Sequence, residues 1–202
     1  MDYYAMIKEV VSGEMPMKSF QEIYFSDEKL QSFLQDNLPE KMLSIAPVCW
    51  SNGDINRVFH RNKWKTAFER YEVFCTLKLF LECSGVEFVA TQKYRMEHCA
   101  LLDVMPTYIN GEKAEMLAEQ IIKDTPSEKS AVKRAKVIRE KIKEAFHIEG
   151  RKYPRWPQDT DWPFSETGRP LKYISQKSDG DLVRFTFLDV DTGNEVIVED
   201  YY

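Results

Sequence analysis

The sequence predicts an α+β protein in which helical elements and antiparallel β-hairpins are followed by a C-terminal three-stranded antiparallel meander. In several segments before residue 150, apolar residues recur at the helical spacings of three and four. After residue 170, short segments of alternating apolar and polar residues are separated by Asp-Gly and Thr-Gly-Asn turns. With 202 residues, 43% of them hydrophobic, the chain is long enough to bury a core.

Two helices are expected near the N-terminus, each beginning at an aspartate that can cap it. Asp2 precedes an amphipathic segment over residues 3–11, and Gly13 follows it as a stop signal. Ser26-Asp27-Glu28 begins the second segment, which extends through Asp36 before Pro39. Both patterns predict modest amphipathic helices.

An edge strand is expected over residues 42–50. The run MLSIAPVCW is apolar and is interrupted by Pro47. The Ser-Asn-Gly-Asp sequence at 51–54 is a strong turn signal, so the strand is expected to end in a hairpin turn.

Residues 71–98 allow two interpretations. A helical stripe of apolar residues enters this segment, but its continuation would bury Lys78 and Glu82. Read with a period of two, the apolar side chains point one way on both sides of a Ser84-Gly85 turn. We therefore favour a helix that ends near Arg70, followed by a β-hairpin over 71–98, with a single long helix as the alternative.

Two helices are expected in the next part of the chain. Residues 112–123 form the first, and a capping box from Thr125 to Glu128 predicts the start of the second, over residues 127–147. The second helix is basic, because nine lysines and arginines face three glutamates between residues 129 and 152. Such a helix usually presents a solvated face, although it could also lie beside an acidic part of its own chain.

The C-terminal meander is predicted from three alternating segments. They cover residues 171–177, 182–189 and 195–202. Asp179-Gly180 supplies the first turn, and the Asp-Thr-Gly-Asn sequence at 191–194 supplies the second.

The predicted domain organisation rests on the stretch YPRWPQDTDWPF at residues 153–164. It separates a mainly helical body, residues 1–150, from a Trp/Pro-rich linker and β-meander, residues 151–202. We expect the two parts to pack as one globular unit, with the linker aromatics sealing the seam between them.

Composition excludes several classes of protein. No window approaches the ~20 apolar residues of a membrane span, and the first residues lack a secretory signal pattern, so a cytoplasmic protein is expected. The net charge of −5 makes nucleic acid an unlikely partner. The cysteines show no metal-ligand spacing, so no metal site and no cofactor are predicted, and free thiols are expected at Cys49, Cys75, Cys83 and Cys99.

The candidate binding residues lie in the linker and in the acidic meander. Tryptophans are favoured anchors at protein interfaces, and a row of carboxylates attracts a basic partner. The predicted binding residues are Trp156, Trp162, Asp189, Asp191, Glu195, Glu199 and Asp200.

A catalytic alternative rests on the ionisable residues of the helical body. Glu97, His98 and Cys99 are an acid, a base and a nucleophile in sequence, but neighbours in a strand point to opposite faces. His147 lies at the predicted end of the basic helix. The alternative hypothesis is a small hydrolase-like enzyme with an acid/base site between the helical part and the meander.

The segment from His147 to Tyr202 resembles the C-terminal modules of small bacterial cytosolic proteins of unassigned activity, some of which are immunity proteins of toxin systems. The resemblance lies in EGRKYPRWPQ, WPF, GRPLKYISQ and GDLVRFTFLDVDTGNEVIVEDYY, which cover about a quarter of the chain. It implies a non-enzymatic interaction protein that covers the active site of a toxin. An acidic surface would suit a basic nuclease toxin.

Overall fold

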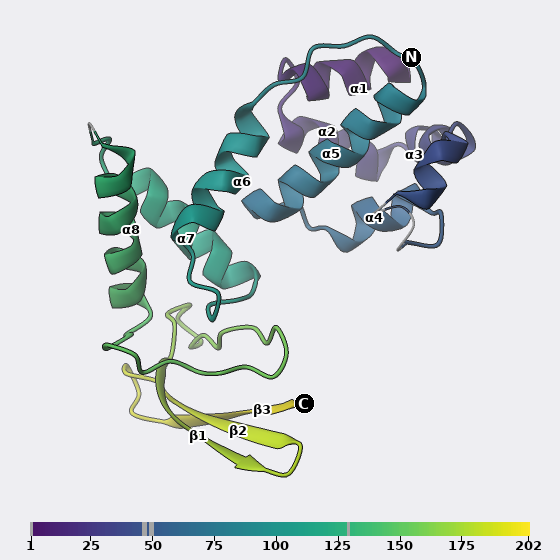
Figure 1. Ribbon diagram of the computed structural model, residues 1–202. Helices are drawn as coiled ribbons and strands as arrows, with labels where there is room; N and C mark the ends of the chain where they lie inside the picture. Colours follow the sequence, from purple (N-terminus) through teal and green to yellow (C-terminus); the bar gives the residue numbers. More distant parts are fainter. Residues whose placement is uncertain (1, 46–47, 49–50, 129) are drawn as a thin grey trace. The chain divides into compact units, whose positions relative to one another are not determined.

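The computed structural model describes residues 2–45, 48, 51–128 and 130–202, and within them it has helices followed by one three-stranded antiparallel sheet (Figure 1). The α+β class expected from the sequence is confirmed. The chain forms two compact units, Met1–Cys99 and Ala100–Tyr202. The boundary expected near residue 150 therefore lies inside the second unit.

The first unit is helical in the part that the structure describes. Asp2 accepts a hydrogen bond from the Ala5 N–H at 3.1 Å and caps the first helix, and Asp27 caps the third, so both predicted helices are confirmed. The elements are α1 (Tyr3–Ser12), α2 (Met17–Ser26), α3 (Glu28–Asp36), the 3-10 helix η1 (Glu40–Ser44), α4 (Ile55–Arg61), α5 (Ala67–Cys83) and the first part of α6 (Lys93–Val104).

The β-hairpin predicted over residues 71–98 is wrong. Most of its first strand belongs to α5, and its last residues belong to α6. A capping box begins α5, because the Thr66 hydroxyl and the Glu69 carboxylate each accept from the other's backbone N–H. The predicted burial of Lys78 and Glu82 does not occur, because they form a partly exposed i,i+4 ion pair at 3.0 Å.

The edge strand predicted over residues 42–50 is not found in the described residues. Residues up to Ser44 form η1, and residues 46–47 and 49–50 of the prediction lie outside the described part. The turn residue Asp54 begins a helix instead of a hairpin, because its carboxylate accepts from the Arg57 N–H at 3.1 Å and caps α4.

An aromatic cluster forms part of the core of the first unit. The Tyr24 ring lies 5.2 Å from Phe59 and 5.9 Å from Trp64, and all three are buried. The Trp64 backbone has a left-handed φ of 60°, and its indole N–H donates to the Phe59 carbonyl at 2.9 Å. This hydrogen bond satisfies the buried indole and holds the loop after α4 against the cluster.

The second unit contains the end of α6, two further helices and the sheet. The helices are α7 (Glu112–Asp124) and α8 (Ala131–Ala145), and the strands are β1 (Lys172–Asp179), β2 (Leu182–Leu188) and β3 (Glu195–Tyr201). The predicted start of the basic helix is wrong. Ser130 caps α8, whereas the Thr125 hydroxyl donates to the Ile121 carbonyl at the end of α7.

The predicted meander is confirmed. The strand order is β1-β2-β3, and both pairs are antiparallel. A register shift between Tyr173 and Ser175 marks a bulge in β1, and Phe185 and Phe187 of β2 are fully buried on one face of the sheet. In the described part of the chain, no helix is long and apolar enough to cross a membrane.

Candidate functional site

Of the two predicted tryptophan anchors, one is buried in the second unit and the other is partly buried. Trp162 is 2% exposed, and its indole N–H donates to the Leu171 carbonyl at 2.9 Å. Trp156 is half-buried, lies 4.4 Å from the Phe185 ring, and donates to the Tyr108 carbonyl at 3.0 Å. Trp162 therefore offers no contact area to a partner, and Trp156 offers only part of its ring.

A small cleft of about 460 Å³ lies beside Trp156. Two of its lining residues, Tyr108 and Tyr153, stack in parallel with ring centroids 4.0 Å apart. Burial is the main cause that raises the Tyr108 pKa, and Tyr153 and Glu140 raise it further. The two rings act by packing, which fixes the linker near the start of α7.

Asp200 is a buried hydrogen-bond acceptor and not one of the exposed carboxylates of the meander. It is 7% exposed, and its carboxylate accepts from the Thr160 hydroxyl at 2.7 Å and from the Gln158 N–H at 3.1 Å. Burial alone would raise its pKa, but these bonds and one from the Tyr201 N–H outweigh burial and lower it. Asp200 therefore attaches the linker to β3.

Asp189 and Asp191 belong to the turn between β2 and β3. The Asp189 carboxylate accepts from the Asp191 N–H at 2.9 Å, and this bond lowers the Asp189 pKa. The Asp191 carboxylate pairs with Arg169 at 2.7 Å. Both carboxylates thus stabilise local structure, although they remain near the surface.

Glu195 and Glu199 are the predicted acidic residues that remain on the exposed side of β3. Glu199 pairs with Arg184 of the neighbouring strand at 2.8 Å, with both side chains nearly half exposed. Glu195 is exposed, and within the described residues no cation pairs with it. Glu195 therefore carries the least compensated carboxylate among the predicted binding residues.

Sequence reasoning missed the apolar residues of the same strand. Ile197 is 63% exposed, Tyr201 53% and Val196 38%. The signal was present in EVIVEDYY, because apolar residues occupy both alternating positions, although only one side of a strand can face a core. We call Glu195, Ile197, Glu199 and Tyr201, which share one face of the strand, the β3 surface. Val196 belongs to the opposite face, where it pairs with Phe187.

The β3 surface lies at the edge of the sheet. β3 follows β2 at the end of the strand order, and the linker covers only its last residues, where the Gln158 side chain donates to the Tyr201 carbonyl at 3.0 Å. Natural proteins usually protect an edge strand with charges, bulges or covering segments. In the described chain, residues 195–198 have glutamate as their single charged residue.

The net negative charge of the protein comes from the linker and the sheet. Residues 153–202 contain ten carboxylates and five basic side chains, so this segment carries the whole formal net charge of −5. Asp159 lies between two residues that bind Asp200, so this exposed carboxylate adds to the charge near the end of β3.

The basic helix α8 uses its arginines on neighbouring helices of its own unit. Arg139 donates from Nε to the Asp103 carbonyl at the end of α6, at 3.0 Å. Arg134 donates to the Ile122 carbonyl near the end of α7, at 2.7 Å. Cations are favoured at helix C-termini, so these arginines act as caps. The ion pairs given above for the acidic meander come instead from Arg169 and Arg184.

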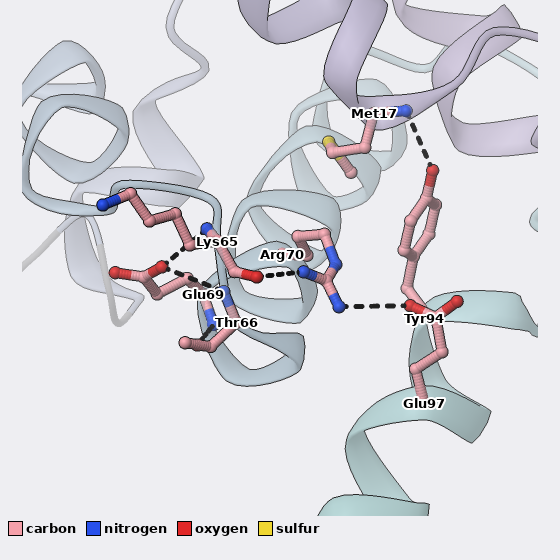
Figure 2. A network of polar contacts seen from close by, with 7 residues as sticks. All are labelled: Met17, Lys65, Thr66, Glu69, Arg70, Tyr94 and Glu97. Carbon is pink, nitrogen blue, oxygen red and sulfur yellow. Dashed lines mark hydrogen bonds and ion pairs between the residues drawn. The ribbon is translucent and has the colours of Figure 1, made fainter. Parts of the chain in front are cut away.

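The acid and base of the catalytic hypothesis are held by neighbours in the first unit. Figure 2 shows the Arg70 guanidinium between the Lys65 carbonyl and the Glu97 carboxylate, which lies 3.7 Å from an Arg70 nitrogen. The same view shows Tyr94, which accepts from the Met17 N–H at 3.2 Å. These contacts tie the start of α6 to α5 and α2.

His98 packs between two aromatic rings. Its ring stacks on Tyr71 with centroids 4.4 Å apart and meets the Phe68 ring edge-on at 5.1 Å. Burial lowers the pKa of His98, so the neutral ring is favoured. Cys99, which follows it, is exposed.

His147 belongs to the second unit and lies just after the end of α8. Its role there is structural and not catalytic. Its backbone has a left-handed φ of 54°, and its N–H donates to the Glu144 carbonyl at 3.0 Å. Within the described residues, no three His, Cys, Asp or Glu side chains gather in a way that could hold a metal ion.

In comparisons with known proteins, no family model, no curated protein and no solved structure matches the chain.

Proposed function

We propose that this protein is a non-enzymatic protein-binding protein of the bacterial cytoplasm, and that the β3 surface contacts a basic partner. The observation that carries the proposal is the exposure of Ile197 and Tyr201 on an acidic edge strand. Exposed apolar side chains beside an unpaired carboxylate, here Glu195, are typical of a surface that another macromolecule covers.

The partner is expected to combine lysines or arginines with an apolar patch. Glu195 and Asp159 offer the partner charge complementarity, while Ile197 and Tyr201 offer it apolar contact area. A basic toxin has this chemistry, which agrees with the resemblance of residues 147–202 to modules of immunity proteins. The protein would then act by covering the toxin's surface.

Four of the residues expected from the sequence to bind a partner have structural roles instead. Trp162 and Asp200 hold the second unit together, as do the turn residues Asp189 and Asp191. Their role is to present β3 in a fixed position. The binding energy is assigned instead to the apolar residues of the β3 surface and to Glu195.

The enzyme alternative stays a hypothesis without an observation in its favour. Glu97 pairs with Arg70, His98 is enclosed by aromatic rings, and His147 ends a helix in the other unit. Each residue has a local structural role.

Photo-crosslinking in bacterial cells that express the full chain tests the proposal. A photoreactive phenylalanine analogue replaces Ile197 in one variant and Ser175 in the control. Both residues pair with Thr186, so they lie on the same face of the sheet at its two edges. We expect a basic polypeptide to be crosslinked from position 197 and not from position 175. No adduct at 197, or equal adducts at both positions, would contradict the proposal.

If a partner is crosslinked, its affinity for the purified full chain should depend on charge. Glu195→Lys should weaken binding by about tenfold or more, and added salt should weaken binding by the native protein. Asp181→Lys, in the exposed turn between β1 and β2, is the matched control.

A further inference from the structure

An extended segment of the first unit, residues 86–90, has one face on the core and one face free. It follows the end of α5 and contains no helix, turn or bend. Val86, Phe88 and Ala90 pack against the core cluster, whereas Glu87 and Val89 point outward, and Val89 is 81% exposed. The alternation predicted for this segment is therefore real, although no partner strand pairs with it in the described chain.

The backbone of this segment is hydrogen-bonded at its two ends, and the described chain gives it no hydrogen bonds between them. The Val86 N–H donates to the Leu81 carbonyl at 3.0 Å, and the Thr91 N–H donates to the Val11 carbonyl of α1 at 2.9 Å. Among the described residues, no hydrogen bond engages the peptide groups of residues 87–90. In an extended chain, residues two apart direct their peptide groups to the same side. Glu87 and Val89 therefore direct theirs toward α1, as Thr91 does.

A groove of about 1170 Å³ lies between this segment and α1. Figure 1 shows α1 beside the part of the chain that leads from α5 to α6. The other wall of the groove is a stripe at helical spacing formed by Ala5, Lys8, Glu9 and Ser12. The groove exceeds the range of about 300–1,000 Å³ that is usual for small-molecule pockets. Its length and its free backbone suit an extended polypeptide better than a compact ligand.

The groove is acidic. Four carboxylates and one ammonium group line it, and the five residues are Glu9, Glu14, Glu82, Glu87 and Lys8. Of the carboxylates, Glu82 pairs with Lys78, and within the described chain no cation pairs with the other three. A bound segment that carries lysine or arginine would therefore meet a complementary surface.

We infer that this groove binds an extended basic segment of another protein, which adds as a β-strand to residues 86–90. The peptide groups of Glu87 and Val89 would pair with the incoming backbone, and its basic side chains would lie beside Glu9 and Glu87. This site belongs to the first unit and does not depend on the β3 surface of the second.

Fluorescence anisotropy with the full chain and labelled peptides tests the inference. The probe is a capped hexapeptide that alternates lysine or arginine with threonine or valine, and the control peptide has glutamate at each basic position. We expect saturable binding of the basic peptide and at least about tenfold weaker binding of the acidic one, because the groove carries excess negative charge.

Val89→Pro is the decisive variant. Proline removes the N–H that would pair with the peptide, but in the free protein that N–H has no partner, so folding should be preserved. Its matched control, Val89→Ala, keeps the N–H and removes most of the side chain. We expect Val89→Pro to weaken binding about tenfold, the equivalent of about one hydrogen bond, and Val89→Ala to weaken it less than about threefold.

The outcomes distinguish this site from the β3 surface. Glu195→Lys should leave peptide binding unchanged if the groove binds the peptide. Equal affinity of native protein and Val89→Pro, equal affinity for both peptides, or no saturable binding of the basic peptide would each overturn the inference. Circular dichroism of each variant confirms that it is folded.

Discussion

The Thr160 hydroxyl donates a 2.7 Å hydrogen bond to the carboxylate of Asp200, forty residues further along the chain. The backbone N–H of Gln158 donates to the same oxygen at 3.1 Å. Together these bonds attach the linker to β3. The Asp200 carboxylate, which the sequence analysis placed among the binding residues, is therefore a structural hydrogen-bond acceptor.

Asp200→Ala should lower the free energy of unfolding by about 2 kcal/mol, because it leaves the Thr160 hydroxyl and the Gln158 and Tyr201 N–H groups without their acceptor. Thr160→Val should cost about 1 kcal/mol, since it removes one of these bonds. Urea denaturation of the full chain measures both. Asp159→Ala, an exposed neighbour, serves as the control and should leave the midpoint nearly unchanged.

The depressed pKa of Asp200 also predicts a dependence of stability on pH. A carboxyl group whose folded pKa lies below its unfolded value stabilises the protein above the unfolded pKa. This contribution is lost as the pH falls from the unfolded pKa, about 3.9, through the lower folded one. In Asp200→Asn the loss of stability on acidification should be smaller. Equal slopes for both proteins would show that Asp200 does not contribute.

The lowered pKa of His98 predicts a second change of stability with pH, in a higher pH range than that of Asp200. Its folded pKa is lowered by burial, so protonation favours the unfolded chain. Stability should therefore fall as the pH decreases through the unfolded value of about 6.5 toward the folded one. His98→Phe should keep the contacts with Tyr71 and Phe68 and abolish this part of the pH profile. Thermal unfolding between about pH 7.5 and 5 measures it.

Gly111 is expected to tolerate no side chain. Its φ is 105°, and an added Cβ would lie 2.7 Å from the Asp161 carboxyl carbon. Gly111→Ala should therefore destabilise the protein by more than about 1 kcal/mol, because strain and overlap act together. Gly180→Ala, where φ is also positive but nothing lies within 4 Å of the added atom, is the control. Destabilisation of equal size in both variants would leave backbone strain as the sole cause.

The sequence predicted the sheet well because its signals are local. Asp-Gly and Asp-Thr-Gly-Asn turns and an alternating pattern are sufficient to specify β1 to β3. The capped helices α1 and α3 were predicted for the same reason, because Asp2 and Asp27 mark their first turns.

The helix α5 was missed because its apolar residues surround it. Val73, Phe74, Leu77 and Phe80 are buried, while Tyr71, Cys75 and Leu79 also pack against the core. A helix enclosed on most sides shows no single stripe, so a period of two fits its sequence as well as a helical period. The capping box of Thr66 and Glu69 marks the start of α5, which both interpretations share, so it does not decide where the helix ends.

The predicted site mixed exposed residues with internal ones because charge and aromatic content do not reveal burial. Trp162 and Asp200 are both buried, each with hydrogen-bond partners far along the chain. Glu195 had no such partner and stayed on the surface. Ile197 and Tyr201 were not among the predicted binding residues, because the selection followed tryptophans and carboxylates.

The stretch from Tyr153 to Phe164 looks like a spacer, but the indole N–H groups of Trp156 and Trp162 both donate to fixed carbonyls. Its length is therefore as constrained as that of a core helix, and insertions or deletions there should not be tolerated. Protein engineers who wish to attach a reporter or an affinity tag inside the second unit should choose the turn at Gly180, where an added side-chain atom meets nothing within 4 Å.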